Sequence, residues 1–552
     1  MTPPSNSDRQ NFPEAAHNWD LERLYDDLAT AKKTYNPYAR KGLSEPEKEH
    51  LRGLLCGYSP DKIGAQIHKT ADGIKSALSK TLYRYVEILT KRPTYSLKSW
   101  EDVAEWLAPN YTINPAAVAC KQDWDGAGDI SNFYGRRDEL GALEQSIVQN
   151  NCRLIAIFGM GGIGKTTLAV RIAKQLQDRF EYVIRRSLSY APPIQQLLAQ
   201  LIQFVSDGQA TPEQPTISQL MEYLRSHRCL LMLDEWEGVF ASGEMAGRYA
   251  DGYGEYSQLI QRIANENHQS CLVLTSREKS TEMTLWERDN LQVKLLHLKG
   301  LKPVEARDIL ADNRLSDPDE WDNLIETYRG NPLALKIICG IIRDFFNGSV
   351  SQFRQRNTIV IEDFLGELLE QQVGRLSPFE KEIVYWLAIE PDPVSFSQLS
   401  NQILLPVYES DLIKAVKSLR QRSLIETIST PATTTFTLQP TLKRYIVKVL
   451  NDNFCEEIVQ AIRNQTIDGL ELLRNLSIVT EPNPESDIRA RQFRLIVMPI
   501  RDQLTTFFRS DRKLANHLNE IQSMLEGKSA LEVGYATDNL QNLLLALSQI
   551  DS

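Results

Sequence analysis

Long hydrophobic runs are missing from this chain of 552 residues. A helix that crosses a membrane needs roughly 18 or more consecutive apolar residues, and no stretch approaches that length. The first residues, Met-Thr-Pro-Pro-Ser-Asn-Ser, also lack the apolar core of a signal peptide. We therefore expect a cytoplasmic protein with no membrane partner.

Cysteine and histidine are scarce as well, with 7 residues of each. The cysteines lack the C-x-x-C spacing that is typical of zinc sites, and the histidines do not cluster. Scattered cysteines fit a reducing compartment. The sequence thus argues against a metal-centred enzyme.

Positive charge is in short supply too, since 62 Lys and Arg residues face 72 Asp and Glu residues, for a net charge of −10. This balance argues against nucleic-acid binding by the chain as a whole, although not by one basic module. With 42% hydrophobic and 24% charged residues, the composition is ordinary for soluble globular proteins. The length allows about three to five domains of roughly 100–200 residues each.

A glycine-rich segment at residues 158–169 is the most informative feature that is present. It reads Phe-Gly-Met-Gly-Gly-Ile-Gly-Lys-Thr-Thr-Leu-Ala and meets the phosphate-loop pattern G-x-x-x-x-G-K-[ST]. In such a loop, backbone N–H groups cradle phosphate oxygens, the lysine reaches the β- and γ-phosphates, and the next hydroxyl ligates Mg²⁺. An apolar run at 154–158 and a helical pattern at 167–173 supply the required strand–loop–helix context. The predicted nucleotide-binding residues are Gly159, Gly161, Gly162, Ile163, Gly164, Lys165, Thr166 and Thr167, with Thr166 also a Mg²⁺ ligand.

A second apolar run, at residues 229–233, ends in Asp234 and Glu235. Such a run is typical of a buried parallel strand, which would put Asp234 at the carboxyl end, where it can bind Mg²⁺ directly or through water. Glu235 could orient or deprotonate the attacking water. Alone, the pair also fits an acidic turn after a core strand. The phosphate loop upstream favours the Mg²⁺ site.

A third apolar run, at residues 271–274, is followed by Thr-Ser-Arg. A cation at the end of a strand beside the acidic one can sense a γ-phosphate. Arg277 suits this role because its planar fork binds phosphate bidentately. The alternative is a solvated surface arginine. We predict Glu235 and Arg277 as the catalytic residues.

Together with further motifs, these segments resemble NB-ARC ATPases of the STAND class, in a bacterial, cyanobacterial-type form. This class includes plant disease-resistance receptors and the animal apoptosome scaffold. The resemblance covers about residues 130–450 and rests on the order and spacing of its motifs. These are Phe-Tyr-Gly-Arg-Arg-Asp-Glu-Leu at 133–140, the phosphate loop, the strand at 182–188, Leu-Met-Leu-Asp-Glu at 231–235, Thr-Ser-Arg-Glu at 275–278 and Gly-Asn-Pro-Leu-Ala-Leu at 330–335.

The resemblance implies that Gly135 and Arg136 help to close the site over adenine and that Pro332 packs against adenine and ribose. On physical grounds alone, the Gly-Asn-Pro sequence ending at Pro332 is only a turn and a helix start. The resemblance also implies that ATP, ADP and Mg²⁺ are the cofactors.

After residue 373 the pattern is typical of a winged helix: three helices, then a hairpin from 424–428 to 434–438. In plant relatives this hairpin ends in Met-His-Asp, whose histidine contacts the β-phosphate of ADP. The matching positions here are Leu-Gln-Pro, which makes Gln439 the predicted latch. Because glutamine donates a hydrogen bond but carries no charge, we expect the latch to be weaker.

Residues 43–90 form a separate helical module, in which Ser44, Ser59 and Thr70 are expected to cap three helices. The third helix is expected to carry an apolar stripe as far as Tyr85. The order of helices resembles a DNA-binding helix-turn-helix, and residues 40–92 contain eleven Lys/Arg against six Asp/Glu. No Arg or Asn is placed for base readout, so an adaptor that binds an effector protein is the other interpretation.

The expected fold is a multidomain α/β plus α architecture built around a P-loop NTPase parallel sheet. The predicted segments are an N-terminal helix-turn-helix-like domain (1–95), a linker with one short helix (96–130), the nucleotide-binding domain (131–295), an ARC helical bundle (296–372), a winged helix (373–450) and C-terminal helices (451–552).

The function that these patterns favour is a signalling switch. ADP would hold a closed state, exchange for ATP would permit self-association, and slow hydrolysis would reset the switch. An ATP-gated transcription regulator that binds DNA through residues 43–90 is the alternative. A metabolic kinase fits less well, because it would leave the winged helix and the Gly-Asn-Pro motif without a role.

Overall fold

The computed structural model describes two compact units, Met1–Ala119 and Cys120–Ser552. Within the described residues, no helix is both long enough and apolar enough to cross a membrane. The described residues are Phe12, Ala15, 19–39, 42–67, 69–111, 120–126, 130, 132–210, 213–289, 291–356, 363–430 and 433–548.

The first unit is helical, and its helices begin where polar caps predict them. Ser44 and Glu47 form a capping box, and the Ser59 side chain accepts a hydrogen bond from the backbone of Lys62. Apolar side chains from all its described helices share one core. The helices are α2 (Leu21–Tyr35), α3 (Glu45–Leu55), α4 (Pro60–Gln66), α5 (Ala71–Lys80), α6 (Leu82–Leu89) and α7 (Glu101–Tyr111).

The single helix expected to run from Thr70 to Tyr85 is in fact two helices, α5 and α6. The break lies at Thr81, where φ is −127° and ψ is −83°. The Thr81 hydroxyl donates to the carbonyl of Ala77 at 2.7 Å, so the side chain is satisfied by the last turn of α5. Thr70 occupies the capping position of α5, but its side chain makes no capping bond.

The segment predicted as a linker contributes to the first core. Leu97, Val103 and Leu107 are buried there, the last two on α7. The boundary between the two units falls after Ala119, inside the same predicted segment.

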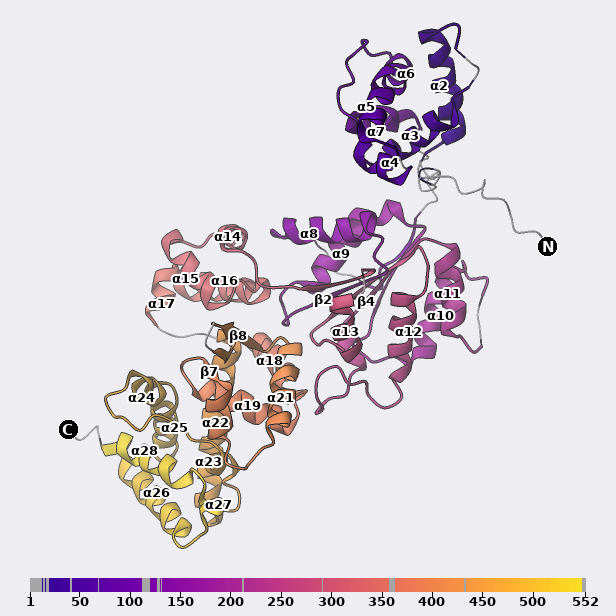
Figure 1. Ribbon diagram of the computed structural model, residues 1–552. Helices are drawn as coiled ribbons and strands as arrows, with labels where there is room; N and C mark the ends of the chain where they lie inside the picture. The colour runs from indigo at the N-terminus through magenta and orange to yellow at the C-terminus, as the bar shows by residue number, and fades with distance from the viewer. Residues whose placement is uncertain are drawn as a thin grey trace. The chain divides into compact units, whose positions relative to one another are not determined.

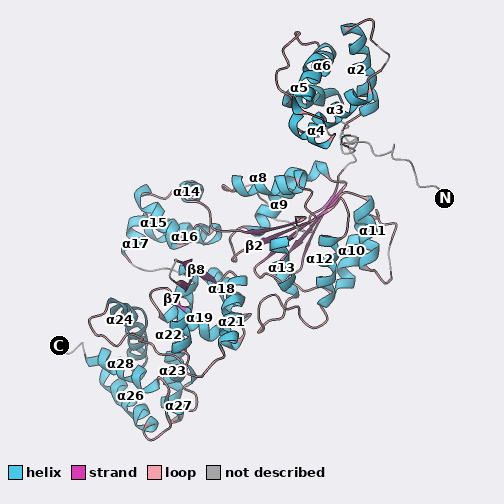
Figure 2. Ribbon diagram, in the orientation of Figure 1, coloured by secondary structure: helices cyan, strands magenta, loops and turns pink. Residues whose placement is uncertain are grey.

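Six strands of the second unit form a parallel sheet in the order β1-β3-β4-β5-β2-β6. Figure 2 shows this sheet in magenta at β2, with cyan helices around it. The expected mixed α/β class is therefore confirmed. Because the strands are parallel, their carboxyl ends meet at one edge, which is where such sheets bind ligands. The strands are β1 (Lys121–Asp123), β2 (Leu154–Phe158), β3 (Tyr182–Ser187), β4 (Cys229–Asp234), β5 (Cys271–Ser276) and β6 (Val293–His297).

Alternate side chains of the central strands β2, β3, β4 and β5 enter two apolar cores, one on each face of the sheet. On β2, Ile155 and Ile157 join the core that includes α8 and α9, whereas Leu154 and Ala156 join the core that includes α10, α11 and α12. This two-sided burial explains why the strands read as continuous apolar runs. The helices are α8 (Arg137–Glu144), α9 (Lys165–Leu176), α10 (Ile194–Val205), α11 (Ile217–Ser226), α12 (Gly254–Asn265) and α13 (Thr281–Asp289).

A helical bundle follows the sheet, and then helices with a small antiparallel sheet of order β7-β9-β8 (Figure 1). The hairpin β8–β9 lies where the sequence predicts it. The bundle helices are α14 (Pro303–Asp312), α15 (Trp321–Thr327), α16 (Pro332–Phe346) and α17 (Val350–Gln355). The next elements are α18 (Asp363–Gly374), α19 (Pro378–Ile389), β7 (Val394–Ser395), α20 (Phe396–Gln402), α21 (Glu409–Gln421), β8 (Ile425–Ser429) and β9 (Thr434–Leu438).

A 25-residue helix, α22 (Pro440–Asn464), leads directly from β9 into the C-terminal helices. The Asn451 amide donates to the carbonyl of Leu495, and the Cys455 thiol lies 3.6 Å from the carbonyl of Ile500. One apolar core runs from the bundle to these last helices, so the three segments predicted after residue 295 share their interior. The remaining helices are α23 (Glu471–Asn475), α24 (Asp487–Gln492), α25 (Met498–Phe508), α26 (Asp511–Leu525), α27 (Ala530–Val533) and α28 (Ala536–Ser548).

Candidate functional site

The phosphate loop joins β2 to α9 at the carboxyl edge of the sheet. Gly164, which precedes α9, has a φ of +97°, a conformation that side chains rarely adopt. The ammonium of Lys165 donates to the carbonyls of Gly159 and Met160, at 2.9 and 3.0 Å. These two bonds fold the lysine back over its own loop. A phosphate would have to replace them.

Lys165 is buried, and burial lowers the pKa of its ammonium to about 8. The nearby Arg277 guanidinium lowers it further, while the carboxylates of Glu237, Asp234 and Glu235 oppose the shift. A bound phosphate would add negative charge beside the ammonium and would therefore favour its protonated form.

Asp234, at the end of β4, is 1% exposed and is held from three sides. One carboxylate oxygen accepts hydrogen bonds from the hydroxyl groups of Thr166, at 2.8 Å, and Thr275. The other pairs with the Arg185 guanidinium at 2.6 Å. The predicted Mg²⁺ ligands Thr166 and Asp234 are thus in direct contact.

These oxygens fit a Mg²⁺ ion, which prefers hard oxygen ligands and takes few of them from protein. Within the described residues, no cluster of three or more His, Cys, Asp or Glu side chains could hold a metal by itself. A Mg²⁺ ion at Thr166 and Asp234 would thus depend on phosphate oxygens and water for its other ligands.

Glu235 follows Asp234 with a φ of +60°, in the left-handed region. Its carboxylate accepts a hydrogen bond from the Ser187 hydroxyl at 2.8 Å, and its backbone N–H donates to the Thr275 hydroxyl. A strained backbone that aims a carboxylate at the phosphate site is consistent with the predicted role in positioning water.

Arg277 follows β5 and forms an ion pair with Glu237, with Nε 3.1 Å from the carboxylate. Glu237 lies on the short 3-10 helix η3 (Trp236–Val239) after Glu235. Its other oxygen accepts the backbone N–H of Arg277 at 3.0 Å. The guanidinium is therefore held beside the phosphate loop by a carboxylate that the sequence analysis did not identify.

Glu278, the next residue, contacts a different set of partners. Its carboxylate pairs with Arg375 at 2.6 Å and with Arg422, on the loop after α21, at 2.5 Å. Arg422 also pairs with Glu380 of α19 at 3.3 Å. Glu278, Arg422 and Glu380 are 2%, 3% and 0% exposed, so this is a fully buried ionic cluster. Burial raises the pKa of Glu278, and the two guanidinium groups oppose that rise.

The Gly-Asn-Pro motif touches the phosphate loop directly. The Asn331 amide donates to the carbonyl of Gly161 at 3.0 Å, and its oxygen caps α16 by accepting from Leu333 and Ala334. Gly162 faces the same motif, because a Cβ there would lie 2.8 Å from Leu333. Asn331 thus ties the bundle to the loop.

Arg136, which directly precedes α8, also contacts the phosphate loop. It is buried, its guanidinium donates to the carbonyl of Ile163 at 3.0 Å, and it pairs with Glu139. Its backbone N–H donates to Glu305 of α14, and a side chain at Gly135 would clash with that glutamate. The motif therefore joins the loop to the bundle.

Most of the predicted residues line one cavity of about 290 Å³. Asp234 does not line this cavity, but it accepts a hydrogen bond from Thr166, which does. Gly135, Arg136, Gly159 and Ile163 do not line it. The predicted residues that do so are Gly161, Gly162, Gly164, Lys165, Thr166, Thr167, Glu235, Arg277 and Pro332.

Gln439 lies elsewhere, in a larger cavity of about 860 Å³ that Ile163 also lines. Its amide donates to the backbone carbonyl of Ser423 at 3.5 Å. The structure therefore does not bring Gln439 into the cavity of the phosphate loop.

Sequence reasoning missed several residues that hold the site. Arg185 was read only as part of a strand, although a charged residue in a buried strand is itself a signal of a buried partner. Asn331 was read only as part of a turn, although asparagine before proline is a strong capping signal. Thr275 belongs to the Thr-Ser-Arg-Glu motif, but its bond to Asp234 could not be inferred from it, and Glu237 and Arg422 give no local signal.

Comparison with known proteins agrees with this geometry. Residues 136–300 match the model of the NB-ARC domain. A WD repeat-containing protein of Nostoc sp., described as uncharacterised, is 40% identical, over 76% of this chain and 36% of its own length. A probable disease resistance protein of Arabidopsis thaliana is 25% identical, over 54% of this chain and 38% of its own length. The chain thus spans little more than a third of each of these relatives.

Among solved structures, a Walker-type ATPase of Pyrococcus abyssi aligns with a TM-score of 0.43 and 15% identity, over 57% of this chain and 96% of its own length.

Proposed function

We propose that this chain, which carries an NB-ARC domain at residues 136–300 and is distantly related to plant disease-resistance proteins, is a signalling switch that ADP holds closed and ATP opens. The NB-ARC domain is a P-loop ATPase domain. The switching behaviour, the self-association of the ATP state and the slow hydrolysis that resets it are our proposal.

The nucleotide chemistry follows from the cavity beside the loop. Lys165 would turn from the carbonyls of its own loop to the β- and γ-phosphates, while Thr166 and Asp234 would hold Mg²⁺. Mg²⁺ would neutralise charge on the phosphates. Pro332 and Lys336 line the same cavity and supply a surface for the ribose and base.

Hydrolysis would rest on Glu235 and Arg277. Glu235 would orient the attacking water, and Arg277 would stabilise charge on the γ-phosphate. Arg277 is paired with Glu237, so it must leave that carboxylate before it can contact a phosphate. That exchange is consistent with slow turnover.

The observation that carries the switch is the pairing of Arg277 and Glu278 with two different regions. A γ-phosphate that draws Arg277 away from Glu237 would shift the segment after β5. Glu278, the next residue, would move with it, and Glu278 pairs with Arg422 and Arg375. Because a ligand shifts an equilibrium only by binding its two states differently, the nucleotide needs a contact that depends on its γ-phosphate. Arg277 is that contact, and Glu278 transmits its movement.

The test is native mass spectrometry of the full chain after purification, then with ADP and with a non-hydrolysable ATP analogue. We expect ADP to co-purify with a monomer and the analogue to raise the mass to a multiple of the monomer. Lys165→Ala, which removes the phosphate contact, is the matched control and should stay monomeric in both. Unchanged mass together with no retained nucleotide would refute the switch.

DNA binding through residues 43–90 gains less support. Lys75 on α5 pairs with Asp61, and Asp72 occupies the first turn of the same helix. Both reduce the positive charge that phosphate contacts require. Binding of the full chain to duplex DNA that weakens steeply with salt and prefers one sequence would reverse this assessment.

A further inference from the structure

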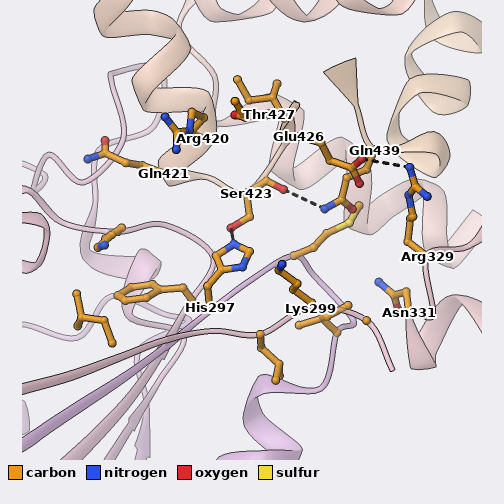
Figure 3. Close-up of a pocket in the computed structure, with 18 of the residues that line it drawn as sticks. His297, Lys299, Arg329, Asn331, Arg420, Gln421, Ser423, Glu426, Thr427 and Gln439 are labelled. Atoms are coloured by element: carbon orange, nitrogen blue, oxygen red, sulfur yellow. Dashed lines mark hydrogen bonds and ion pairs between the residues drawn. The ribbon is translucent and has the colours of Figure 1, made fainter. Parts of the chain in front are cut away.

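A second cavity lies apart from the one that Lys165 and Thr166 line. It has a volume of about 860 Å³, within the range of small-molecule sites. It lies where the end of β6, the loop before α16 and the elements α21 and β8 meet (Figure 3). Of the residues predicted to bind nucleotide, Ile163 and Gln439 line it, whereas Lys165, Thr166 and Arg277 line the other cavity.

The cavity is strongly basic. Its described lining includes five lysine and arginine side chains and a single glutamate, Glu426, which is already paired with Arg329 at 3.2 Å. The five are Lys279, Lys299, Arg329, Lys417 and Arg420. A concave site lined by one sign of charge concentrates ions of the opposite sign.

Three of these cations, Lys299, Lys417 and Arg420, are exposed and form no ion pair within the described part of the chain. Lys417 and Arg420 are three residues apart on α21, so they share one face of that helix. Lys299 comes from the segment after β6, and Figure 3 shows it and Arg420 across the cavity from each other. Because like charges repel, the segment after β6 and helix α21 repel each other across the cavity. No acidic side chain among the described residues pairs with these three cations.

Neutral donors complete the lining. The Ser423 hydroxyl lies 3.0 Å from the His297 ring, and Thr427 and Gln439 extend from the hairpin and the start of α22. Met160 and Ile163 of the phosphate loop also line the cavity. A ligand here would touch the back of the loop without occupying the phosphate site.

We propose that this cavity binds a small anion with two or more phosphate groups, at a site separate from the phosphate loop. Arginine and lysine pair strongly with phosphate oxygens, and several cations at several points suit a multiply charged ligand better than a single carboxylate. Such an anion would connect the sheet, the bundle and the elements around α21. This inference goes beyond the nucleotide switch and does not depend on it.

The test uses tripolyphosphate as the probe and titration calorimetry as the measurement. The full chain carrying Lys165→Ala serves as the background, because it removes the phosphate-loop contact. We expect this variant to bind tripolyphosphate. Adding Lys417→Ala and Arg420→Ala should weaken the binding by about tenfold or more, since two charge-assisted contacts are lost.

Lys448→Ala with Arg512→Ala provides the matched control. Both are exposed residues of the same unit outside the cavity, so their loss should leave the affinity unchanged. ADP should bind the Lys165→Ala variant no more tightly than pyrophosphate does if phosphate groups alone are recognised. No binding of tripolyphosphate to that variant, or equal binding after loss of Lys417 and Arg420, would overturn the proposal.

Discussion

Arg277 and Glu278 are adjacent in the chain, yet their side chains form ion pairs with different regions. Arg277 pairs with Glu237 beside the phosphate loop, and Glu278 pairs with Arg422, which follows α21. The same short segment after β5 therefore takes part in both the nucleotide site and the buried contact to the elements that follow the bundle. Four predictions follow from this geometry and from that of the loop.

The first prediction concerns protonation of Lys165. Its pKa is about 8 in the free loop, against 10.5 for an ordinary lysine, and a bound phosphate would raise it. At pH 8.5 most of the free protein has a neutral Lys165, so ADP binding should take up close to one proton. The affinity for ADP should accordingly fall as the pH rises above 8.

Calorimetry at pH 8.5 in two buffers of different ionisation enthalpy measures that proton directly. At pH 6.5 the lysine is already charged, so its contribution should vanish. An uptake that is equal at the two pH values would contradict the assignment.

The second prediction concerns the buried cluster. Arg422→Ala leaves the carboxylate of Glu278 buried with only Arg375, and breaking a buried pair costs roughly 3–5 kcal/mol. We expect faster hydrogen exchange in β8 and β9 and faster release of ADP. Lys414→Ala, an exposed residue of α21 that lines neither cavity, is the matched control and should change neither rate.

Replacing both partners, by Glu278→Leu and Arg422→Met, should recover part of the loss, because the buried Glu278 carboxylate is removed with its partner and Glu380 keeps its hydrogen bonds from Ser377 and Ser418. If the double variant exchanges as fast as Arg422→Ala, the cluster is not what holds these elements together.

The third prediction separates Mg²⁺ binding from hydrolysis. Asp234→Ala removes the carboxylate that contacts Thr166 and Arg185, so the Mg²⁺ dependence of ATP affinity should disappear. Glu235→Gln keeps that carboxylate and should bind MgATP normally, while hydrolysis slows by about 10²–10⁴-fold. Single-turnover hydrolysis and Mg²⁺ titrations measure the two effects. Wild-type hydrolysis by Glu235→Gln would eliminate this residue as the base.

The fourth prediction compares two residues near the loop. Asn331→Ala loses both the bond to Gly161 and the cap of α16, which should cost about 1 kcal/mol and weaken ADP binding roughly fivefold. Gln439→Ala should change the ADP affinity by less than about twofold, because its amide donates to Ser423 rather than to the phosphate loop. Fluorescence titration with labelled ADP measures both. A larger effect of Gln439→Ala would restore the latch that the sequence suggests.

The sequence predicts those parts of the site that depend on local pattern. Lys165, Thr166 and Asp234 were identified because each belongs to a short motif at the end of an apolar strand. The contact between Glu278 and Arg422 could not be predicted, because 144 residues separate them and the Thr-Ser-Arg-Glu motif does not indicate a partner for its glutamate. The break at Thr81 could not be predicted either, since the apolar stripe continues across a change in the backbone angles of one residue.

The long helix α22 would carry a movement near the hairpin to the C-terminal helices. Its 25 residues span about 37 Å, and they run without interruption from the hairpin beside Gln439 into the C-terminal helices. If α22 moves as a rigid helix, a rotation of about 10° at Pro440 would displace Asn464 by roughly 6 Å. Small adjustments beside the phosphate loop could therefore emerge as large displacements at Asn464, where a partner could detect them.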